Sequence, residues 1–371
     1  MARVSDVIAW MEKIAPASLA EEWDNPGLQV GRPDAEVRHV FLALDPSPET
    51  VSAACSAGAD MLVTHHPLIF SPLSKIDLRE PSGRIVAKAI DAGLTIFSAH
   101  TNLDSASGGL NDLLAGMIGM KDLMPLLPVQ GDVEFKLVFF VPESHAERVY
   151  ALLADLPVGK IGNYKGCLFA GPGKGRFIPQ KDAHPYTGRV GRHSEVDELR
   201  VETRVFQRDL KYVMDEIKKI HPYETVAMDV YPLASRLTPH GIGRVGHLEE
   251  PVSLKALALR LKNRLDLKSV RVSGSPDMQV TRVALCTGSG SSLLKSFFAD
   301  TAQVFVSGDL KYHDAMNALA EGRALIDIGH FASEHIIVAE LGKRLAYEAR
   351  KAGVDMKFTA WEGEKDPFFN L

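Results

Sequence analysis

The first third of the chain alternates short apolar runs with amphipathic segments, and this alternation restricts the fold more than any other feature. Residues 37–44, 60–64 and 94–99 are predicted strands, and residues 47–57 and 82–92 between them are predicted helices. Strands that alternate with helices in this way usually pair in parallel and are joined by right-handed crossovers. The sequence therefore predicts an α/β fold with a mainly parallel sheet.

The alternation stops after residue 127 and resumes after residue 234, which predicts an interrupted core. Between these positions the expected elements follow the order β-α-β-β-α-β, which is typical of a ferredoxin-like α+β domain. We therefore expect residues 1–127 and 235–371 to form the two halves of one α/β core, with mainly parallel sheets. Residues 128–234 are expected to form an inserted α+β domain.

Composition excludes several classes of protein. The chain has 371 residues, of which 46% are hydrophobic and 24% charged, as in soluble globular proteins of two or three domains. The formal net charge of −5 gives no basic excess for a nucleic-acid backbone, so direct nucleic-acid binding is not expected. The three cysteines are widely spaced and form no CxxC pair, which argues against disulfides. No apolar run predicts a membrane span or a signal peptide, and we expect a cytoplasmic protein.

One predicted strand ends abruptly at a pair of histidines. The strand end predicted at residues 60–63 leads into His65 and His66, and Pro67 prevents the strand from continuing. Ligands of open α/β sheets bind outside the carboxyl ends of the strands, which is where this pair is expected. Neighbouring side chains of an extended segment point to opposite sides, so the two imidazoles could bind different metal ions, or one could support the other.

Two later strand ends offer further metal ligands. His330 and Glu334 lie at positions i and i+4 where a helix begins, so both side chains can project from one helix face toward a zinc, manganese or iron ion. Asp104 could bridge two ions through its two oxygens, or it could cap the helix that follows it. His100 could be a ligand, a proton carrier or a supporting group, and the supporting role is favoured.

Two glycine-rich turns follow predicted strands in the C-terminal half. Residues 287–290 and 307–309 each precede a helix whose backbone N–H groups could hold a phosphate, although ordinary strand-to-helix turns are the default interpretation. His313 lies one turn into the second helix and is a candidate acid or base, with a surface histidine as the alternative. The segment around Trp23 is expected to be a surface loop with the indole packed beneath it.

Taken together, these motifs resemble the Nif-three-like family, whose members are also labelled GTP cyclohydrolase I type 2. The resemblance covers nearly the whole chain and includes residues 22–31, 63–67, 98–104, 307–313 and 329–334. It implies a cofactor of two divalent metal ions per subunit, which are zinc, iron or manganese. The implied ligands are His65, His66, Asp104, His330 and Glu334.

The middle segment resembles the PII/CutA-like insert of longer family members, through residues 161–164, 221–224 and 241–246. The resemblance further implies a ring-shaped homohexamer with metal sites that face an internal cavity. The leading hypothesis is a metal-dependent hydrolase of a nucleotide or a related phosphorylated heterocycle, with His100 or His313 moving the proton. The alternative is a non-catalytic metal-binding protein whose insert senses a small molecule or docks a regulatory protein.

Overall fold

The computed structural model describes residues 2–128, 134–162, 164–233 and 240–369, and these residues form two compact units. One unit combines residues 1–129 with residues 238–371, and the other consists of residues 130–237. The expected boundary between residues 234 and 235 lies outside the described residues. In the described part of the chain, no helix combines the length and the apolar character needed to cross a membrane.

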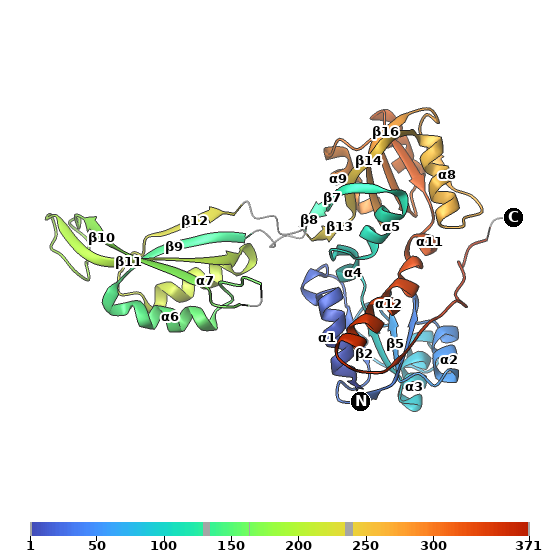
Figure 1. Cartoon of the computed structure of the whole chain (residues 1–371), viewed down its shortest axis with the longest axis horizontal. Helices are drawn as coiled ribbons and strands as arrows, with labels where there is room; N and C mark the ends of the chain where they lie inside the picture. The colour runs from blue at the N-terminus through green and yellow to red at the C-terminus, as the bar shows by residue number, and fades with distance from the viewer. Residues whose placement is uncertain (1, 129–133, 163, 234–239, 370–371) are drawn as a thin grey trace. The chain divides into compact units, whose positions relative to one another are not determined.

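A five-stranded sheet in the first unit follows the predicted alternation (Figure 1). Its strands in spatial order are β19 (Lys357–Ala360), β4 (His39–Ala43), β5 (Met61–Thr64), β6 (Thr95–Ser98) and β2 (Gly27–Val30). All neighbours pair in parallel except β2, which runs antiparallel to β6. Every residue of β4, β5 and β6 is buried, as expected for parallel strands with helices on both faces.

Helices cover both faces of this sheet. One face packs against α1 and α12, and the other packs against the crossover helices α2 and α3. The bounds of these helices are Val4–Ile14 for α1, Ile336–Lys351 for α12, Pro48–Ser56 for α2 and Pro81–Ala92 for α3. The first 14 residues and the last long helix therefore share one core, because α12 returns the C-terminal part of the chain to the N-terminal sheet.

A six-stranded sheet forms the other half of the same unit. Its strands in spatial order are β15 (Arg271–Ser273), β18 (Ala324–Asp327), β17 (Val304–Gly308), β16 (Gln279–Ser289), β14 (Arg244–Ser253) and β7 (Met120–Met124). The pairs β16–β17 and β17–β18 are parallel, and the outer pairs are antiparallel. The sheet is accompanied by α8 (Leu254–Arg264), α9 (Leu294–Ala299) and α10 (Tyr312–Ala320). Two short pairs complete the unit, β1 (Ala2–Arg3) with β3 (Glu36–Val37) and β8 (Leu127–Pro128) with β13 (Gly241–Ile242).

The segment after β6 forms two helices that are separated by a short break. These are α4 (Thr101–Ser105) and α5 (Leu110–Ile118). Gly109 lies at the break, where a Cβ atom would overlap the carbonyl oxygen of Leu103. Asp104 therefore lies inside a short helix and does not act as the N-cap of a longer one.

The last long helical segment is also interrupted. A short helix, α11 (His330–Glu334), follows β18 directly, and His335 separates it from α12. His330 and Glu334 lie within the short α11 at the end of the second sheet, whereas α12 packs on the first sheet.

The second unit has the ferredoxin-like order predicted from the sequence. Its elements are β9 (Glu134–Pro142), α6 (Ala146–Asp155), β10 (Leu168–Phe177), β11 (Ser194–Phe206), α7 (Gln207–Ile220) and β12 (Met228–Pro232). The sheet order is β10-β11-β9-β12, and all pairs are antiparallel. Both helices pack on one face of this sheet over an apolar core of its own (Figure 1). The predicted fold class, an α/β core interrupted by a ferredoxin-like insert, is confirmed.

Candidate metal centre

Four imidazoles converge where strands of the two core sheets end. His65 and His66 follow β5, His100 follows β6, and His330 opens the helix after β18. The His66 ring lies 5.1 Å from His65, 5.6 Å from His100 and 5.5 Å from His330, measured between ring centroids. Two groups of ligand atoms could each hold a metal ion, His65 with His66 and His100, and His66 with His330 and Glu334. Within each group the ligand atoms lie within 4.8 Å of one another, and His66 belongs to both.

Each imidazole is anchored through its Nδ1 atom, always at 2.8 Å from an oxygen. The four pairs are His65 with the Ala99 carbonyl, His66 with Asp45, His100 with Asp24, and His330 with Asp309. An acceptor at Nδ1 keeps the proton on that atom and leaves the lone pair on Nε2, which is the usual support for a metal-binding histidine. The cluster is therefore organised to present Nε2 atoms to a cation.

The carboxylate of Glu334 lies at the centre of this arrangement. Its Oε2 atom is 3.0 Å from Nε2 of both His66 and His330, and its Oε1 atom is 3.7 Å from Nε2 of His65. Glu334 and His65 are buried, and neither Oε2 of Glu334 nor Nε2 of His65 has a hydrogen-bond partner among the described residues. Buried polar atoms are seldom left without a partner because their desolvation is costly. A bound cation would satisfy both atoms, so the residues present fit a metal centre.

Asp104 lies beside this cluster without belonging to either group of ligand atoms. Its Oδ1 atom is 3.8 Å from Nε2 of His65 and accepts a hydrogen bond of 3.4 Å from the hydroxyl of Thr287. Burial raises the pKa of Asp104, although the nearby His65 opposes the rise. The carboxylate is therefore near enough to contribute to the centre, and its bridging role stays a prediction.

The imidazoles of His66 and His330 hold protons tightly in the absence of a metal ion, whereas the carboxylate of Glu334 stays ionised. Burial opposes the charged form of His66, but the carboxylates of Asp45 and Glu334 beside the ring raise its pKa to about 10. The adjacent carboxylate of Glu334 raises the pKa of His330 to about 9, with Asp309 contributing and burial opposing. Burial alone would raise the pKa of Glu334, but the surrounding histidines hold it well below its usual range. A divalent ion would take the place of these protons.

The two glycine-rich turns pack against the ligand helix. A Cβ atom at Gly288 would overlap Oε1 of Glu334, and one at Gly308 would lie 2.6 Å from the backbone nitrogen of His330. Gly288 also donates its N–H to Ser333 Oγ at 2.8 Å. Both turns are therefore explained as strand-to-helix turns. Glycine is needed in them because it allows α11 to approach β16 and β17 closely.

Two other residues named from the sequence are His313, which lies outside the cluster, and Trp23, which is not buried as expected. His313 is exposed on the first turn of α10 with its ring edge-on to Tyr312, and it belongs to neither group of metal-binding atoms. The prediction that Trp23 is packed beneath a loop is wrong, because 58% of this residue is exposed. Its ring lies 5.7 Å from Phe70 and 6.2 Å from His100, so the indole stands beside the cluster.

Sequence reasoning missed the carboxylates that hold the imidazoles. Asp45 directly follows β4, as His66 follows β5, so the rule that located the histidines could also have located it. Asp309 lies in the turn after β17, for which the sequence predicted an ordinary turn or a phosphate site and no partner for a histidine. Asp24 gave no local signal, because its contact with His100 joins positions 76 residues apart. Its pKa is lowered to about 2, because hydrogen bonds from His100 and Thr101 outweigh the opposing effect of burial.

Comparison with known families identifies the chain. The family described as Duf34/NIF3 (NGG1p interacting factor 3) matches residues 2–367. The chain belongs to the DUF34/NIF3 family. The expected resemblance is thus confirmed, since the Nif-three-like and NIF3 labels denote the same family.

Relatives of this DUF34/NIF3 protein match over nearly their whole length. A protein of Halalkalibacterium halodurans named GTP cyclohydrolase 1 type 2 homolog is 37% identical over 362 residues, which are 98% of this chain and 97% of the relative. Two solved structures also match, each covering 100% of this chain and 99% of the other. A Bacillus cereus protein related to NIF3 is 36% identical with a TM-score of 0.74, and Staphylococcus aureus protein SA1388 is 29% identical with a TM-score of 0.79.

Proposed function

We propose that the protein is a dinuclear metal-dependent hydrolase that acts on a nucleotide or a related phosphorylated heterocycle. The observation that carries this proposal is the set of four imidazoles, each anchored at Nδ1, around the buried carboxylate of Glu334. When bound, two divalent ions would supply Lewis-acid polarisation of the substrate and a water molecule of lowered pKa. The residues that would hold zinc, iron or manganese are His65, His66, Asp104, His330 and Glu334.

A cavity of about 1090 Å³ supports a substrate larger than a simple anion. It is lined by His66 and His330 together with Lys268 and Arg271, and its volume suits a ligand of nucleotide size. Arg271 is paired with Asp327, whereas Lys268 is exposed and has no ion-pair partner among the described residues. The Lys268 ammonium group is therefore available for a phosphate.

Aromatic side chains beside His100 support a flat heterocycle as part of the substrate. Trp23 and Phe70 are 58% and 51% exposed, and both rings lie within 6.4 Å of the His100 ring, measured between centroids. Exposed aromatic rings next to a polar site offer stacking surfaces for heterocyclic bases. The combination favours a nucleotide over an aliphatic phosphate.

We assign proton transfer to His100 at its Nε2 atom. The buried Asp24 accepts the Nδ1–H of His100 at 2.8 Å, and this contact fixes both the tautomer and the ring orientation. The His100 ring also lies 6.2 Å from the exposed Trp23 between centroids, and one of its nitrogen atoms belongs to the first group of ligand atoms. His313 has no described contact with the cluster, and an acid–base role for it depends on a substrate that extends to α10.

The test is hydrolysis by metal-loaded protein across a panel of nucleotides. GTP comes first, with formate release reporting ring opening and phosphate release reporting ester hydrolysis, because relatives are named GTP cyclohydrolase 1 type 2 homologs. We expect the wild type to hydrolyse at least one nucleotide and His65→Ala to lose more than about a hundredfold in rate. His193→Ala, a change of an exposed histidine in the insert, is the matched control. Equal rates in wild type and His65→Ala, or no binding and no hydrolysis across the panel, would contradict the proposal.

A second function is favoured by the insert. Residues 130–237 form a compact unit with its own core and a pocket, which suits a non-catalytic metal-binding protein that senses a ligand or docks a regulatory partner. In that case Glu334→Ala should leave ligand binding by the insert unchanged, and no nucleotide should be consumed at any metal loading.

A further inference from the structure

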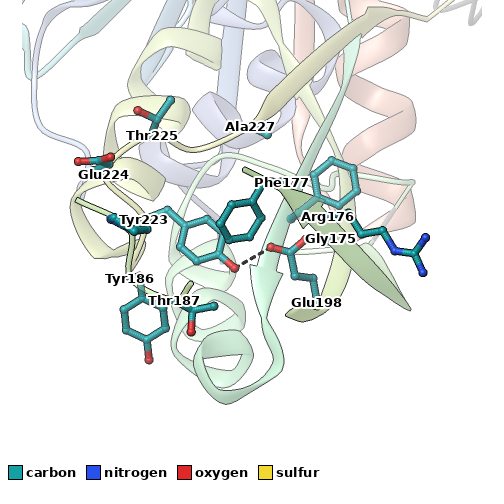
Figure 2. Close-up of a pocket in the computed structure, with 12 residues that line it drawn as sticks. Gly175, Arg176, Phe177, Tyr186, Thr187, Glu198, Tyr223, Glu224, Thr225 and Ala227 are labelled. Carbon is teal, nitrogen blue, oxygen red and sulfur yellow. Dashed lines mark hydrogen bonds between the residues drawn. The ribbon is translucent and has the colours of Figure 1, made fainter. Parts of the chain in front are cut away.

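The insert holds a pocket of about 340 Å³ on the face of its sheet that the helices leave open (Figure 2). Side chains alternate along a strand, and Val201 and Val205 of β11 face the helices, so Glu198 on the same strand faces the other way. Besides β11, the pocket is lined by β9, β10 and the loops that carry Tyr186 and Tyr223. Its volume is that of a small-molecule site.

A buried carboxylate forms the polar part of this pocket. Glu198 is only 9% exposed, and its Oε1 atom accepts a hydrogen bond of 2.7 Å from the Tyr223 hydroxyl (Figure 2). Within the described part of the chain, no hydrogen bond to Oε2 of Glu198 is found. This oxygen lies against Gly175, where a Cβ atom would overlap it. The carboxylate therefore keeps acceptor capacity for a ligand.

The loop that carries Tyr223 is fixed to the sheet through a buried histidine. His221 donates from Nε2 to the carbonyl oxygen of Phe140 at 2.8 Å, and its Nδ1 accepts the N–H of Tyr223 at 3.1 Å. These two contacts agree on one tautomer of the ring. The position of the Tyr223 hydroxyl next to Glu198 is thus set before any ligand binds.

Among the described residues that line the pocket, no cationic side chain is directed at this carboxylate. The only basic residue that lines it is Arg176, whose guanidinium group bonds Glu195 at 2.9 Å and points away from Glu198 in Figure 2. The other charged lining residue, Glu224, is acidic and accepts the N–H of His184 at 3.0 Å. A buried carboxylate without a positive partner favours a ligand that supplies the positive charge.

Aromatic rings supply the rest of the pocket wall. Phe140, Phe177, Tyr186 and Tyr223 line it, and the rings of Tyr186 and Tyr223 lie 6.1 Å apart between centroids. The faces of aromatic rings attract cations, and the attraction grows when water is excluded. A carboxylate among aromatic rings is a combination that recognises ammonium and guanidinium groups.

We propose that this pocket binds a small organic cation, whose ammonium, amidinium or guanidinium group donates to Glu198 between the aromatic side chains of Phe177, Tyr186 and Tyr223. The site is separate from the metal centre in both residues and chemistry. The ligand proposed for the insert is thus a small organic cation.

The test compares charged probes with neutral probes of the same shape on the full-length protein. Benzamidine is paired with benzamide, and phenethylamine with 2-phenylethanol, and each affinity is measured by isothermal titration calorimetry. We expect each cation to bind at least about tenfold more tightly than its neutral partner. Glu198→Gln should remove this preference. Glu202→Gln should keep it, because Glu202 lies on the same strand but pairs with Lys136 and Arg200 outside the pocket.

A second variant keeps the test decisive if Glu198→Gln does not fold. Gly175→Ala leaves every charge in place, but its methyl group would displace the carboxylate of Glu198. We expect this variant to lose cation binding while its melting temperature stays within about 3 °C of the wild type. Equal affinity for charged and neutral probes, no binding of either pair, or cation binding that persists in a folded variant of Glu198 or Gly175 would overturn the proposal.

Discussion

The metal cluster of the core and the pocket of the insert both contain a buried carboxylate, but the two carboxylates have different surroundings. Oε2 of Glu334 lies 3.0 Å from two imidazole nitrogens, and each ring is fixed by a further acceptor. Glu198 has one tyrosine hydroxyl and several aromatic rings. Many fixed lone pairs around one point suit an inorganic cation, and a single acceptor among rings suits an organic one. Both carboxylates are buried, so burial does not distinguish the two sites. The number of fixed atoms that offer a lone pair to a cation does.

The largest effect is expected from removing the central carboxylate. Glu334→Ala should weaken metal binding by more than about a hundredfold. Loss of a residue that only supports a ligand already lowers metal affinity by about 10- to 100-fold, and Glu334 is itself an expected ligand. Metal content after gel filtration, measured by plasma mass spectrometry, gives the result. Glu340→Ala is the control, since Glu340 pairs with Arg344 on the surface of α12. Full metal content in Glu334→Ala would contradict the conclusion that Glu334, unlike Glu198, belongs to a site for an inorganic cation.

A smaller effect is expected when only the support of one imidazole is lost. Asp45→Asn keeps the shape of the side chain but weakens the acceptor for Nδ1 of His66, and metal affinity should fall by about 10- to 100-fold. Competition with a chromophoric chelator measures the affinity. Asp34→Asn changes an exposed carboxylate that pairs with Arg32 and should have no effect. Equal affinities in the two variants would show that anchoring does not matter.

The fold was predictable where burial dominates. Strands with both faces covered have apolar runs, and the predicted runs 37–44, 60–64 and 94–99 contain β4, β5 and β6. The helix breaks at Gly109 and His335 were not predictable, because a pattern of apolar residues does not show where the backbone of a helix is interrupted. At Gly109 the deciding contact is the close approach of the Leu103 carbonyl.

The site was predictable where its residues follow strands. The residues His65, His66, His330 and Glu334 were expected at the carboxyl ends of strands, and the structure brings them together. Asp24 was not predictable in its contact with His100, because no local pattern links residues 76 positions apart. The exposure of Trp23 also depends on tertiary packing, since an indole in a turn-rich segment is usually covered.

A stability experiment separates the close packing of the cluster from the cost of backbone conformation. Gly288 and Gly322 have φ values of +63° and +66°, but only Gly288 has an atom of the cluster where a Cβ would lie. Gly322→Ala should cost about 1–2 kcal/mol of unfolding free energy, and Gly288→Ala about 1–3 kcal/mol more. Urea denaturation measures both. Equal costs would show that α11 does not depend on this close approach.

The pH dependence of the metal-free protein gives a more modest signal. The pKa values of His66 and His330, about 10 and about 9, lie above the ordinary value of 6.5. Their contribution to stability is therefore complete below pH about 6.5 and is lost as the pH rises through about 9 to 10. Metal binding must displace these protons, so affinity should rise between pH about 6 and 9. Calorimetry in buffers of different ionisation enthalpy detects the released protons, and their absence would contradict the assignment.

The smallest effect is expected in the insert when metal is removed. The ferredoxin-like unit has its own apolar core, so chelation should increase hydrogen exchange in α11 and around β5 but leave β9 and β11 unchanged. Hydrogen exchange measured by mass spectrometry follows all four segments in one sample. Increased exchange in β9 on chelation would show that the two sites are coupled.

The most direct test of the central claim is a crystal structure with anomalous scattering data collected at the absorption edge of the metal found by elemental analysis. We expect two anomalous peaks, bounded by the Nε2 atoms of His65, His66 and His330 and by the carboxylates of Asp104 and Glu334. Protein that carries no metal after purification and reloading, or peaks that lie away from His65 and Glu334, would contradict the claim.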